Sequence, residues 1–319
     1  MQPQSRSKWW HQVQSIANRI LLLSGLVLCS SNLHAKTLNV HCGSISKTGP
    51  TSITAALKLL DPSVPNKLDI FGTCNENVLI KGFNRLTLVG TPGASIVDPS
   101  GKTAQTILVV DSADVILRQL TIDGGLVGVQ CDSFSVCRFS GDVVANGSGG
   151  IQITQSRAEL DGTLVRHTDN GLTSLDASSV RVDGGVILDG NGTGVVVDGG
   201  SSFESFGATI SNSSLAGIEA SEHAFVSLSG TTISGNGNGI ELVRHSSLHL
   251  GASNTITANT GYGIFLFDLS FVTFDPGNSV TGNNRNGIGA LDVACFPQFT
   301  ATRGALTNIG GGTTNCAEN

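Results

Sequence analysis

The chain has 319 residues, a formal net charge of −6, 41 glycines and one methionine, and 13% of its residues are charged. Many glycines combined with few charges favour short strands and tight turns over long helices. An acidic chain without a basic stripe argues against a nucleic-acid partner.

The first 35 residues have the features of a secretory signal peptide. Arg6, Lys8 and Arg19 precede the apolar run Ile20–Leu28, and Leu33-His34-Ala35 is similar to a cleavage site. The run is too short to cross a bilayer, so we expect no transmembrane segment in the mature chain. The sequence therefore predicts export to the periplasm, the cell surface or the medium, with cleavage after Ala35.

Cleavage after Ala35 changes the charge balance of the chain. It removes three of the 18 basic residues and none of the 24 acidic ones. The mature chain is then expected to repel acidic polysaccharides, unless a divalent cation bridges the two. We expect no resident cofactor, and a structural or substrate-bridging calcium ion stays open as an alternative.

Residues 36–319 are predicted to form a single domain, with an N-terminal cap over residues 36–66. Thr51 and Ser52 can cap a short helix that ends at Asp61-Pro62. An amphipathic helix is one way to cover the open end of a stack of strands. Coils are predicted over residues 67–293 and a C-terminal cap over residues 294–319. The apolar stripe of the helix comprises Ile53, Ala56, Leu57 and Leu60.

A glycine followed by an aliphatic residue recurs along the chain at steps of 21 to 24 residues. A fixed period of this length indicates a repeat architecture. After each glycine, apolar and other residues alternate, which is the period of a strand with one buried face. The recurring pairs are Gly150-Ile151, Gly171-Leu172, Gly194-Val195, Gly217-Ile218, Gly239-Ile240, Gly263-Ile264 and Gly287-Ile288.

Each repeat contains three such apolar segments, and a polar residue follows the third one. Asn is frequent there because it tolerates the left-handed backbone conformation and its amide can bond along a stack of equal turns. Three strands per coil, stacked in parallel, predict an all-β right-handed parallel β-helix. A leucine-rich repeat does not fit, because the LxxLxL spacing and its helical segment are absent. The recurring polar residues are Asn146, Thr168, Asn191, Ser213, Asn236, Asn259 and Asn283.

Six cysteines remain in the mature chain. An even number in an exported protein favours disulfide bonds. Two cysteines lie near the start, two just before the regular repeats and two after the last repeat. This grouping predicts the pairs Cys42–Cys74, Cys131–Cys137 and Cys295–Cys316, and unpaired small core residues are the alternative.

The segments VHCGSI at 40–45 and FGTCNENVLI at 71–80, with the helix between them, resemble the opening of one protein family. They are similar to secreted bacterial right-handed β-helix proteins of the pectin-lyase-like superfamily, and the repeat pattern is similar too. The resemblance covers nearly all of the mature chain. Members include polysaccharide lyases, glycoside hydrolases, esterases, phage tailspikes and surface proteins, so the resemblance implies architecture more than activity.

The best-known active sites of that superfamily do not carry over to this chain. The Asn-Thr-Asp, Asp-Asp, Gly-His-Gly and Arg-Ile-Lys motifs of polygalacturonases do not occur in the sequence. The Trp-Ile-Asp-His segment typical of pectate lyases is also absent. A candidate site therefore has to come from the residues of the chain itself.

Two consecutive repeats carry similar charged segments, GIEASEH at 217–223 and GIELVRH at 239–245. Because Ile218 and Ile240 are expected to point inward, Glu219 and Glu241 are expected to point outward, one coil apart at ~4.8 Å. Retaining glycosidases use two carboxyl groups ~5–5.5 Å apart. Like charges at that distance raise one pKa, which suits a general acid.

The candidate site extends to neighbouring side chains on the same face. Arg244 is expected between acidic residues of the adjacent coils, and aromatic side chains of the next coil can stack on a sugar ring. No metal ligands are assigned. The candidate catalytic residues are Glu219, Glu241, His223, His245 and Arg244, and the candidate substrate-binding residues are Glu222, Tyr262, Phe265 and Asp268.

The same residues also have a purely structural explanation. Solvated glutamates, histidines at a turn and an arginine between two acids are common surface features, and such ion pairs contribute ~0–1 kcal/mol. The sequence leaves two functions open. One is a protein that binds a polysaccharide or cell-surface glycan along its outer face, or cleaves it as a lyase or glycoside hydrolase. The other is a non-catalytic structural or surface β-helix, and in both cases we expect a monomer.

The export hypothesis predicts the mass of the mature protein. Intact-mass spectrometry of protein recovered from outside the cytoplasm should show a chain beginning at Lys36, and reduction should add the mass of six hydrogens. A mature protein that retains residues 1–35, or one that shows free thiols throughout, would contradict the hypothesis.

Overall fold

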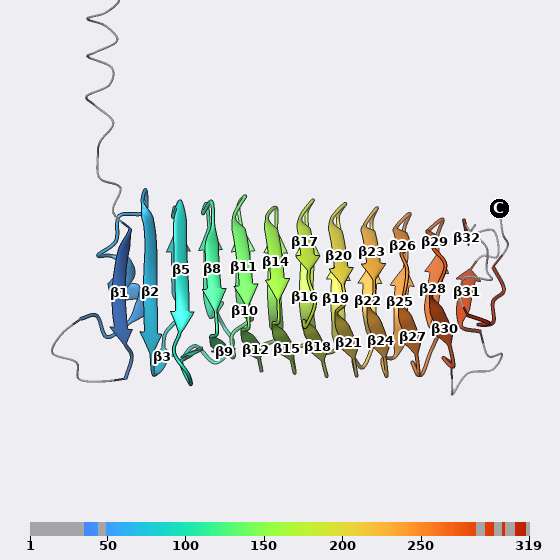
Figure 1. Ribbon diagram of the computed structural model, residues 1–319, viewed down its shortest axis with the longest axis horizontal. Helices are drawn as coiled ribbons and strands as arrows, with labels where there is room; N and C mark the ends of the chain where they lie inside the picture. The colour runs from blue at the N-terminus through green and yellow to red at the C-terminus, as the bar shows by residue number, and fades with distance from the viewer. Residues whose placement is uncertain (1–34, 44–48, 285–290, 297–301, 304–309, 317–319) are drawn as a thin grey trace, which may run out of the picture. The chain divides into compact units, whose positions relative to one another are not determined.

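The computed structural model describes residues 35–43, 49–284, 291–296, 302–303 and 310–316. Residues 36–319 form one compact unit, and within it the described chain winds into a right-handed parallel β-helix (Figure 1). From β2 (Pro65–Phe71) to β31 (Val293–Phe296), each coil contributes one strand to each of three parallel sheets, and β1 (Lys36–His41) and β32 (Thr302–Arg303) extend one of these sheets at its two ends. Strands of the same sheet pair in coil order, so the predicted fold is confirmed.

We name the three sheets A, B and C. Sheet A contains β1 (Lys36–His41), β2 (Pro65–Phe71), β5 (Arg85–Gly90), β8 (Val115–Arg118), β11 (Val136–Ser140), β14 (Arg157–Asp161), β17 (Ser179–Val182), β20 (Ser202–Phe206), β23 (Phe225–Ser229), β26 (Ser247–Leu250), β29 (Phe271–Phe274) and β32 (Thr302–Arg303). Sheet B contains β3 (Thr73–Asn75), β6 (Ser95–Val97), β9 (Thr121–Asp123), β12 (Val143–Ala145), β15 (Leu164–Arg166), β18 (Ile187–Asp189), β21 (Thr209–Ser211), β24 (Thr232–Ser234), β27 (Thr255–Thr257) and β30 (Ser279–Thr281). Sheet C contains β4 (Val78–Lys81), β7 (Ile107–Val110), β10 (Val127–Asp132), β13 (Gly149–Thr154), β16 (Asn170–Leu175), β19 (Thr193–Val197), β22 (Ala216–Ala220), β25 (Asn238–Leu242), β28 (Ile264–Phe267) and β31 (Val293–Phe296).

The interior column predicted from the repeats is present in sheet C. Val195, Ile218, Ile240 and Ile264 pair in register and are fully buried. Each side chain packs on the equivalent side chain of the next coil, so one continuous core runs along the unit. The predicted column is wrong at its last position, where Ile264 pairs with Val293. Ile288, which the repeat pattern placed there, lies outside the described residues.

The recurring glycine is required by a close approach between neighbouring coils. A Cβ atom on Gly217 would lie 2.7 Å from the carbonyl oxygen of Gly239 and 2.7 Å from Cγ2 of Ile233. A Cβ on Gly239 would lie 2.3 Å from the carbonyl oxygen of Gly263. A side chain at these positions would therefore push the stacked coils apart.

The predicted Asn ladder lies next to this glycine, at the corner between sheets B and C. Asn236 Oδ1 accepts from the Ser213 N–H at 2.9 Å, and Asn259 Oδ1 accepts from the Asn236 N–H at 2.9 Å. The ladder ends at Asp292, whose Oδ1 accepts from the Asn283 N–H at 2.9 Å. The ladder members from Thr168 to Asn283 are buried, and the side chains of Asn191, Asn236, Asn259 and Asn283 each accept from a backbone N–H of the preceding coil that water does not reach. The Ser213 hydroxyl has no hydrogen-bond partner among the described residues.

Two details of the predicted ladder are wrong. Asn146 is exposed and donates to Asp123 Oδ1 at 2.7 Å, because the register places it beside His167 and outside the ladder. The left-handed conformation belongs to the residue that precedes the ladder position. Gly235, for example, has a φ of 71° and precedes Asn236, whose own φ is not positive.

Two further ladders close the other corners, and the repeat pattern did not predict their bonding. At the corner between sheets A and B, Asn254 Oδ1 accepts from Thr231 and Asn278 Oδ1 accepts from Asn254, at 2.9 and 3.0 Å. At the corner between sheets C and A, each serine hydroxyl accepts from the backbone N–H of the serine before it, at 3.0–3.2 Å. These serines are Ser112, Ser135, Ser156, Ser178 and Ser201.

The N-terminal helix is confirmed at its start, and the disulfides are confirmed. The helix ends at Leu57, before the predicted Asp61-Pro62, because turn bonds from Leu59 to Ala56 and from Leu60 to Leu57 follow it. Helix α2 (Ile53–Leu57) starts at Ser52, whose hydroxyl accepts from the Ala55 N–H. Glu76 accepts from the Ile53 N–H at 2.6 Å, which ties the helix to the first coils. All three predicted disulfides are confirmed, with Cα–Cα distances of 4.8, 6.5 and 5.2 Å for Cys42–Cys74, Cys131–Cys137 and Cys295–Cys316.

The interior register predicts the effect of a charge in the sheet C column. Ile240→Asp should lower the free energy of unfolding by about 4 kcal/mol or more, because it buries an unpaired carboxylate. Ile187→Asp is the matched control, since Ile187 is 42% exposed on sheet B. Chemical denaturation measures both variants, and an Ile240→Asp protein as stable as the wild type would contradict the register.

Candidate functional site

The two glutamates predicted from the repeats are direct neighbours on sheet C. Glu219 on β22 and Glu241 on β25 are Cα partners in the parallel register. Ile218 and Ile240 beside them are buried, so the alternation of the strand places both carboxylates on the outer face. Both glutamates are half-buried, which removes part of their hydration.

The environment of Glu219 favours its neutral form. Burial is the largest influence that raises the pKa of this carboxyl, followed by the negative charges of Glu241 and Asp198. The positive charge of Arg244 opposes these effects in part. Glu219 therefore holds a proton to a higher pH than a solvated glutamate does.

Glu241 has a partner that the sequence did not indicate. Asn238, at the start of the same strand, donates its side-chain amide to Glu241 Oε1. The Asn238 Oδ1 accepts from the Tyr262 N–H at 2.8 Å, so the amide orientation is set by the next coil. Asn238 thus holds the Glu241 carboxylate in place.

The two carboxylates face a shallow hollow of about 550 Å³. Its walls come from three consecutive coils, at the edge of sheet C next to the corner with sheet B. The lining residues are Ser214, Leu215, Ala216, Glu219, Gly237, Asn238, Glu241, Thr260 and Gly261.

The other predicted catalytic residues, together with Glu222 from the predicted substrate-binding set, lie at the corner between sheets C and A. Glu222, His223, Arg244 and His245 all have positive φ, between 52° and 65°, as two-residue left-handed turns. The rings of His223 and His245 stack with centroids 5.3 Å apart. None of these residues lines the hollow of Glu219 and Glu241. They are therefore turn residues, stacked from coil to coil.

The predicted charge cluster around Arg244 is present only in part. Arg244 Nη1 lies 3.0 Å from Glu222 Oε1, and both side chains are more than half exposed. Within the described part of the chain, Arg244 forms no ion pair with Asp268. Asp268 instead accepts from the His245 N–H through its backbone oxygen at 3.0 Å. An exposed pair of this kind contributes at most about 1 kcal/mol.

An aromatic cluster adjoins the carboxylates on the outer face of sheet C. Phe265 is the Cα partner of Glu241 in the next coil. Its ring lies 5.6 Å from that of Tyr262, 6.3 Å from that of Phe267 and 5.7 Å from that of Phe296. Phe296 joins through the last strand of sheet C, which the repeat pattern did not reach.

A second hollow, of about 600 Å³, covers the preceding coils of sheet C. Gln130, Gln152, Thr173 and Val196 line it. Val196 is the Cα partner of Glu219, so the two hollows adjoin along the helix axis. Together the two hollows follow the helix axis along sheet C. The second hollow is lined by amide and hydroxyl side chains, and the first by the two carboxylates, next to the aromatic cluster.

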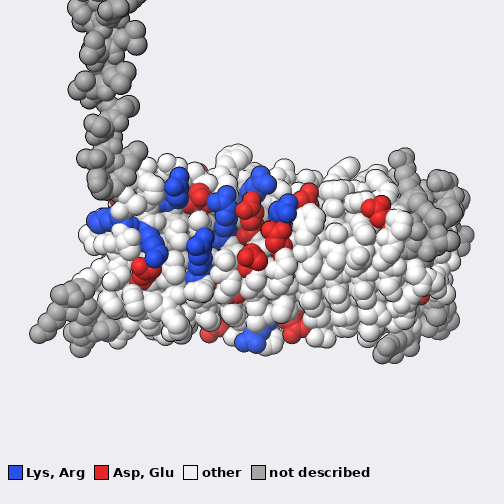
Figure 2. Space-filling view, viewed as in Figure 1, with Lys and Arg blue, Asp and Glu red and all other residues white. Residues whose placement is uncertain are grey.

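Sheet A carries a different surface, in which charges pair with each other. Arg138 lies 2.7 Å from Asp114 and 3.0 Å from Glu159, and Arg181 lies 3.2 Å from Asp183. On the face seen in Figure 2, both signs of charge gather over the N-terminal half and are sparse over the C-terminal half. Paired charges of this kind leave sheet C as the better ligand surface.

One group of possible metal ligands lies within the described residues, but its members already form a disulfide bond and hydrogen bonds. The ligand atoms of Cys42, Cys74 and Glu76 lie within 4.8 Å of one another. The two sulfurs form a disulfide, and Glu76 accepts from the first N–H groups of helix α2. No described helix is long and apolar enough to span a membrane.

These coils and their outward rows of side chains define the class of right-handed parallel β-helix proteins. The family model of the right-handed β-helix region matches residues 105–252 and 209–303, and the chain belongs to this family. The pectin-lyase-like superfamily, which the sequence resembles, has this fold. No curated protein matches the chain by sequence.

Solved structures of a phage protein share the fold. Full-length tailspike protein 2 from Escherichia coli O157:H7 bacteriophage CAB120 is 12% identical, with a TM-score of 0.53, over 85% of this chain and 42% of the tailspike. The enzymatically active domain of tailspike protein 2 of bacteriophage CBA120 matches with the same identity and TM-score, over 85% of this chain and 47% of that domain. The chain spans less than half the length of both.

The raised pKa of Glu219 predicts a pH-dependent stability. A raised pKa in the folded state makes the charged form unfavourable, so the cost is absent well below pH 4.5 and develops as the pH rises above it. Glu219→Gln should therefore be more stable than the wild type at pH 7, with a difference that vanishes near pH 4. Glu204→Gln on sheet A is the control, and thermal unfolding across this range measures both. An equal gain in stability for Glu204→Gln at pH 7 would contradict the assignment of this effect to Glu219 and its neighbour Glu241.

Proposed function

We propose that the protein is exported and binds a polysaccharide along the outer face of sheet C, with Glu219 and Glu241 at the centre. The observation that carries the proposal is the in-register pair of half-buried carboxylates facing a hollow beside an aromatic cluster. Carboxylates accept hydrogen bonds from sugar hydroxyls, and aromatic rings pack against the C–H faces of sugars.

The shape of the face supports an extended ligand. The two adjoining hollows follow the axis of the β-helix across successive coils. A polymer lying along this axis meets similar groups at every coil, because parallel stacking repeats each outward position ~4.8 Å further on. The acidic balance of the mature chain favours a neutral polysaccharide, or an acidic one bridged by a divalent cation.

The carboxylate pair also supports cleavage of the bound glycan. The strands that carry the two glutamates are neighbours in a sheet, with a spacing of ~4.8 Å. Retaining glycosidases use carboxyl groups ~5–5.5 Å apart. Glu219, with its raised pKa, suits the general acid, and Glu241, held by Asn238, suits the nucleophile. In this mechanism Glu219 protonates the leaving oxygen as the glycosidic C–O bond breaks and Glu241 bonds to the anomeric carbon. A water molecule deprotonated by Glu219 then displaces Glu241 and releases the sugar.

A non-catalytic surface role is the second candidate, and the corner turns favour it. The pair between Arg244 and Glu222 and the stacked rings of His223 and His245 explain those residues as links between coils, without a ligand. This role predicts no retardation by any polysaccharide, for the wild type and for variants of the five candidate catalytic residues alike.

A polysaccharide panel tests the proposal. The wild-type protein should be retarded by at least one polysaccharide in affinity electrophoresis. Glu219→Gln, Glu241→Gln and Phe265→Ala should each bind about tenfold more weakly, because each variant loses a charged hydrogen-bond acceptor or a stacking surface. Reducing-end and unsaturated-uronate assays on the retarding polysaccharide then separate hydrolysis from lyase activity.

The matched control for this panel is Glu204→Gln, which changes an equivalent carboxylate on the outer face of sheet A. It should bind as the wild type does. Equal binding by the wild type and all three sheet C variants would exclude the site, and no retardation by any polysaccharide would favour the surface role.

A further inference from the structure

Sheet B carries two columns of hydroxyl side chains on its outer face. In β21, β24, β27 and β30 the strand sequences are Thr-Ile-Ser, Thr-Ile-Ser, Thr-Ile-Thr and Ser-Val-Thr. The middle residue of each strand is fully buried, so the alternation of the strand places both hydroxyl residues outside. The first column contains Thr209, Thr232, Thr255 and Ser279, and the second contains Ser211, Ser234, Thr257 and Thr281.

The two columns form a regular lattice, because the four strands pair without a slip and lie in one row (Figure 1). Thr232, for example, pairs with Thr209 on one side and with Thr255 on the other. Neighbours within a column are therefore ~4.8 Å apart, and the columns lie two strand residues, or ~6.6 Å, apart. Threonine is stiff at χ1, so its hydroxyl and methyl groups keep few orientations.

Buried hydrogen-bond ladders hold both edges of this face. At the corner with sheet A, the N–H groups of Thr231 and Asn254 each donate to an asparagine Oδ1 of the next coil, at 2.9 and 3.0 Å. At the corner with sheet C, the N–H groups of Asn236 and Asn259 do the same, at 2.9 and 3.3 Å. All four residues are buried, so water does not compete for these bonds. The spacing of the columns is thus fixed from both sides.

The face has neither charged nor aromatic residues. The four strands and their flanking turns, residues 207–216, 230–238, 252–261 and 276–284, contain no Asp, Glu, Lys, Arg, His, Phe, Tyr or Trp. The same coils carry Glu219 and Glu241 on sheet C, and Glu204 and Phe225 on sheet A. The uniform composition therefore belongs to sheet B and not to these coils in general.

Most of these hydroxyls are free to bind water. Ser211 donates to Asp189 at 2.7 Å, at the boundary where charged residues begin, and Ser279 and Thr281 bond each other at 3.3 Å. The hydroxyls that have no hydrogen-bond partner among the described residues are those of Thr209, Thr232, Ser234, Thr255 and Thr257.

We propose that this hydroxyl face of sheet B binds the surface of an ice crystal. Water oxygens on a prism plane of ice repeat in a rectangular lattice whose two periods are close to the two spacings of the hydroxyls. Each hydroxyl has one donor and two acceptor sites, so it can replace a surface water of that lattice. A charged side chain would orient water around itself and interrupt the lattice, and the face has none.

The fixed columns also lower the cost of binding, because few side chains have to be ordered on contact with the crystal. A crystalline polysaccharide is another ordered surface, but its recognition uses aromatic rings that pack on the sugars, and this face lacks them. The inference goes beyond the proposed function and shares no residue with the sheet C site.

Ice recrystallisation tests this proposal on the mature protein. We expect the wild type to slow the growth of ice grains in a frozen sucrose solution, and to be enriched in ice that grows slowly from a dilute solution. Thr232→Lys and Thr255→Lys each place a cation in the middle of the array. Each variant should require about tenfold more protein, or more, for the same inhibition.

The matched control is Ser227→Lys, which introduces the same charge on the outer face of sheet A in the coil of Thr232. It should inhibit recrystallisation as the wild type does. Thr232, Thr255 and Ser227 are all partly exposed, so we expect the three lysine variants to remain folded, and thermal unfolding measures this.

Three outcomes would overturn the proposal. One is a wild-type protein that growing ice excludes as it excludes serum albumin. Another is equal inhibition by the wild type and by both folded sheet B variants. The third is retention of the wild type on insoluble cellulose or chitin, lost in Thr232→Lys and Thr255→Lys, without any effect on ice, which would assign the face to a crystalline polysaccharide.

Discussion

The close approach of successive coils at the corner between sheets B and C is the constraint on which the structure depends. The Cβ that Gly217 lacks would lie 2.7 Å from the Gly239 carbonyl oxygen, so neighbouring backbones meet without a side chain between them. The buried Asn ladder bonds the same corner, from Ser213 through Asn236. Glycine supplies the space and asparagine supplies the hydrogen bonds, so the two recur together in the periods of Asn191, Asn236 and Asn259.

The functional face follows from this stacking. A parallel register without slips places every outward residue over its equivalent, so Glu219 meets Glu241 and Glu241 meets Phe265. A repeat that placed Thr or Asn there would avoid the repulsion between two carboxylates. The coils retain this unfavourable pair at a half-buried position, which is expected where a perturbed carboxyl has a chemical role.

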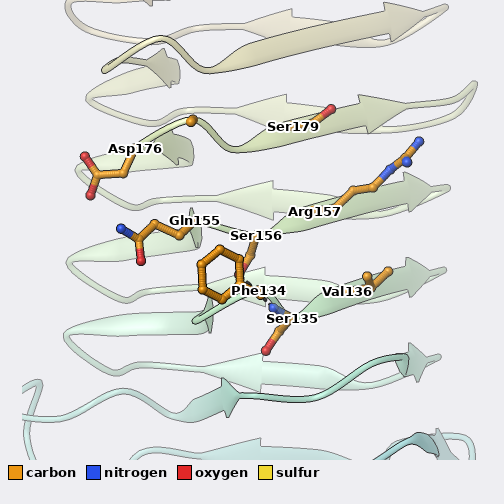
Figure 3. Close-up of a pocket in the computed structure, with 9 residues that line it drawn as sticks. Phe134, Ser135, Val136, Gln155, Ser156, Arg157, Asp176 and Ser179 are labelled. Carbon is orange, nitrogen blue, oxygen red and sulfur yellow. Dashed lines mark hydrogen bonds between the residues drawn. The ribbon is translucent and has the colours of Figure 1, made fainter.

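The turns at the corners vary in length although the strands between them stay regular. The turn of residues 154–156 is one residue shorter than the turn of residues 132–135 in the coil before it. The strands and the serine ladder continue through this coil. The change therefore appears only on the surface, as a hollow beside Phe134 (Figure 3). Loops on a rigid scaffold can change in this way because they carry little of the buried core.

The sequence by itself determined the fold, the period and the register of Glu219 over Glu241, because glycine spacing and alternating apolar residues report directly on repeated local geometry. The grouping of the six cysteines along the chain predicted the three disulfide pairs, and the structure decided against unpaired cysteines. The tertiary structure decided which side chains share a hollow. Whether His223 and Arg244 face Glu219 depends on the left-handed turn between them, and Asn238 reaches Glu241 only through its side-chain rotamer. The join of Phe296 to the aromatic cluster depends on Val293 pairing with Ile264 after an irregular step, where periodicity carries no information.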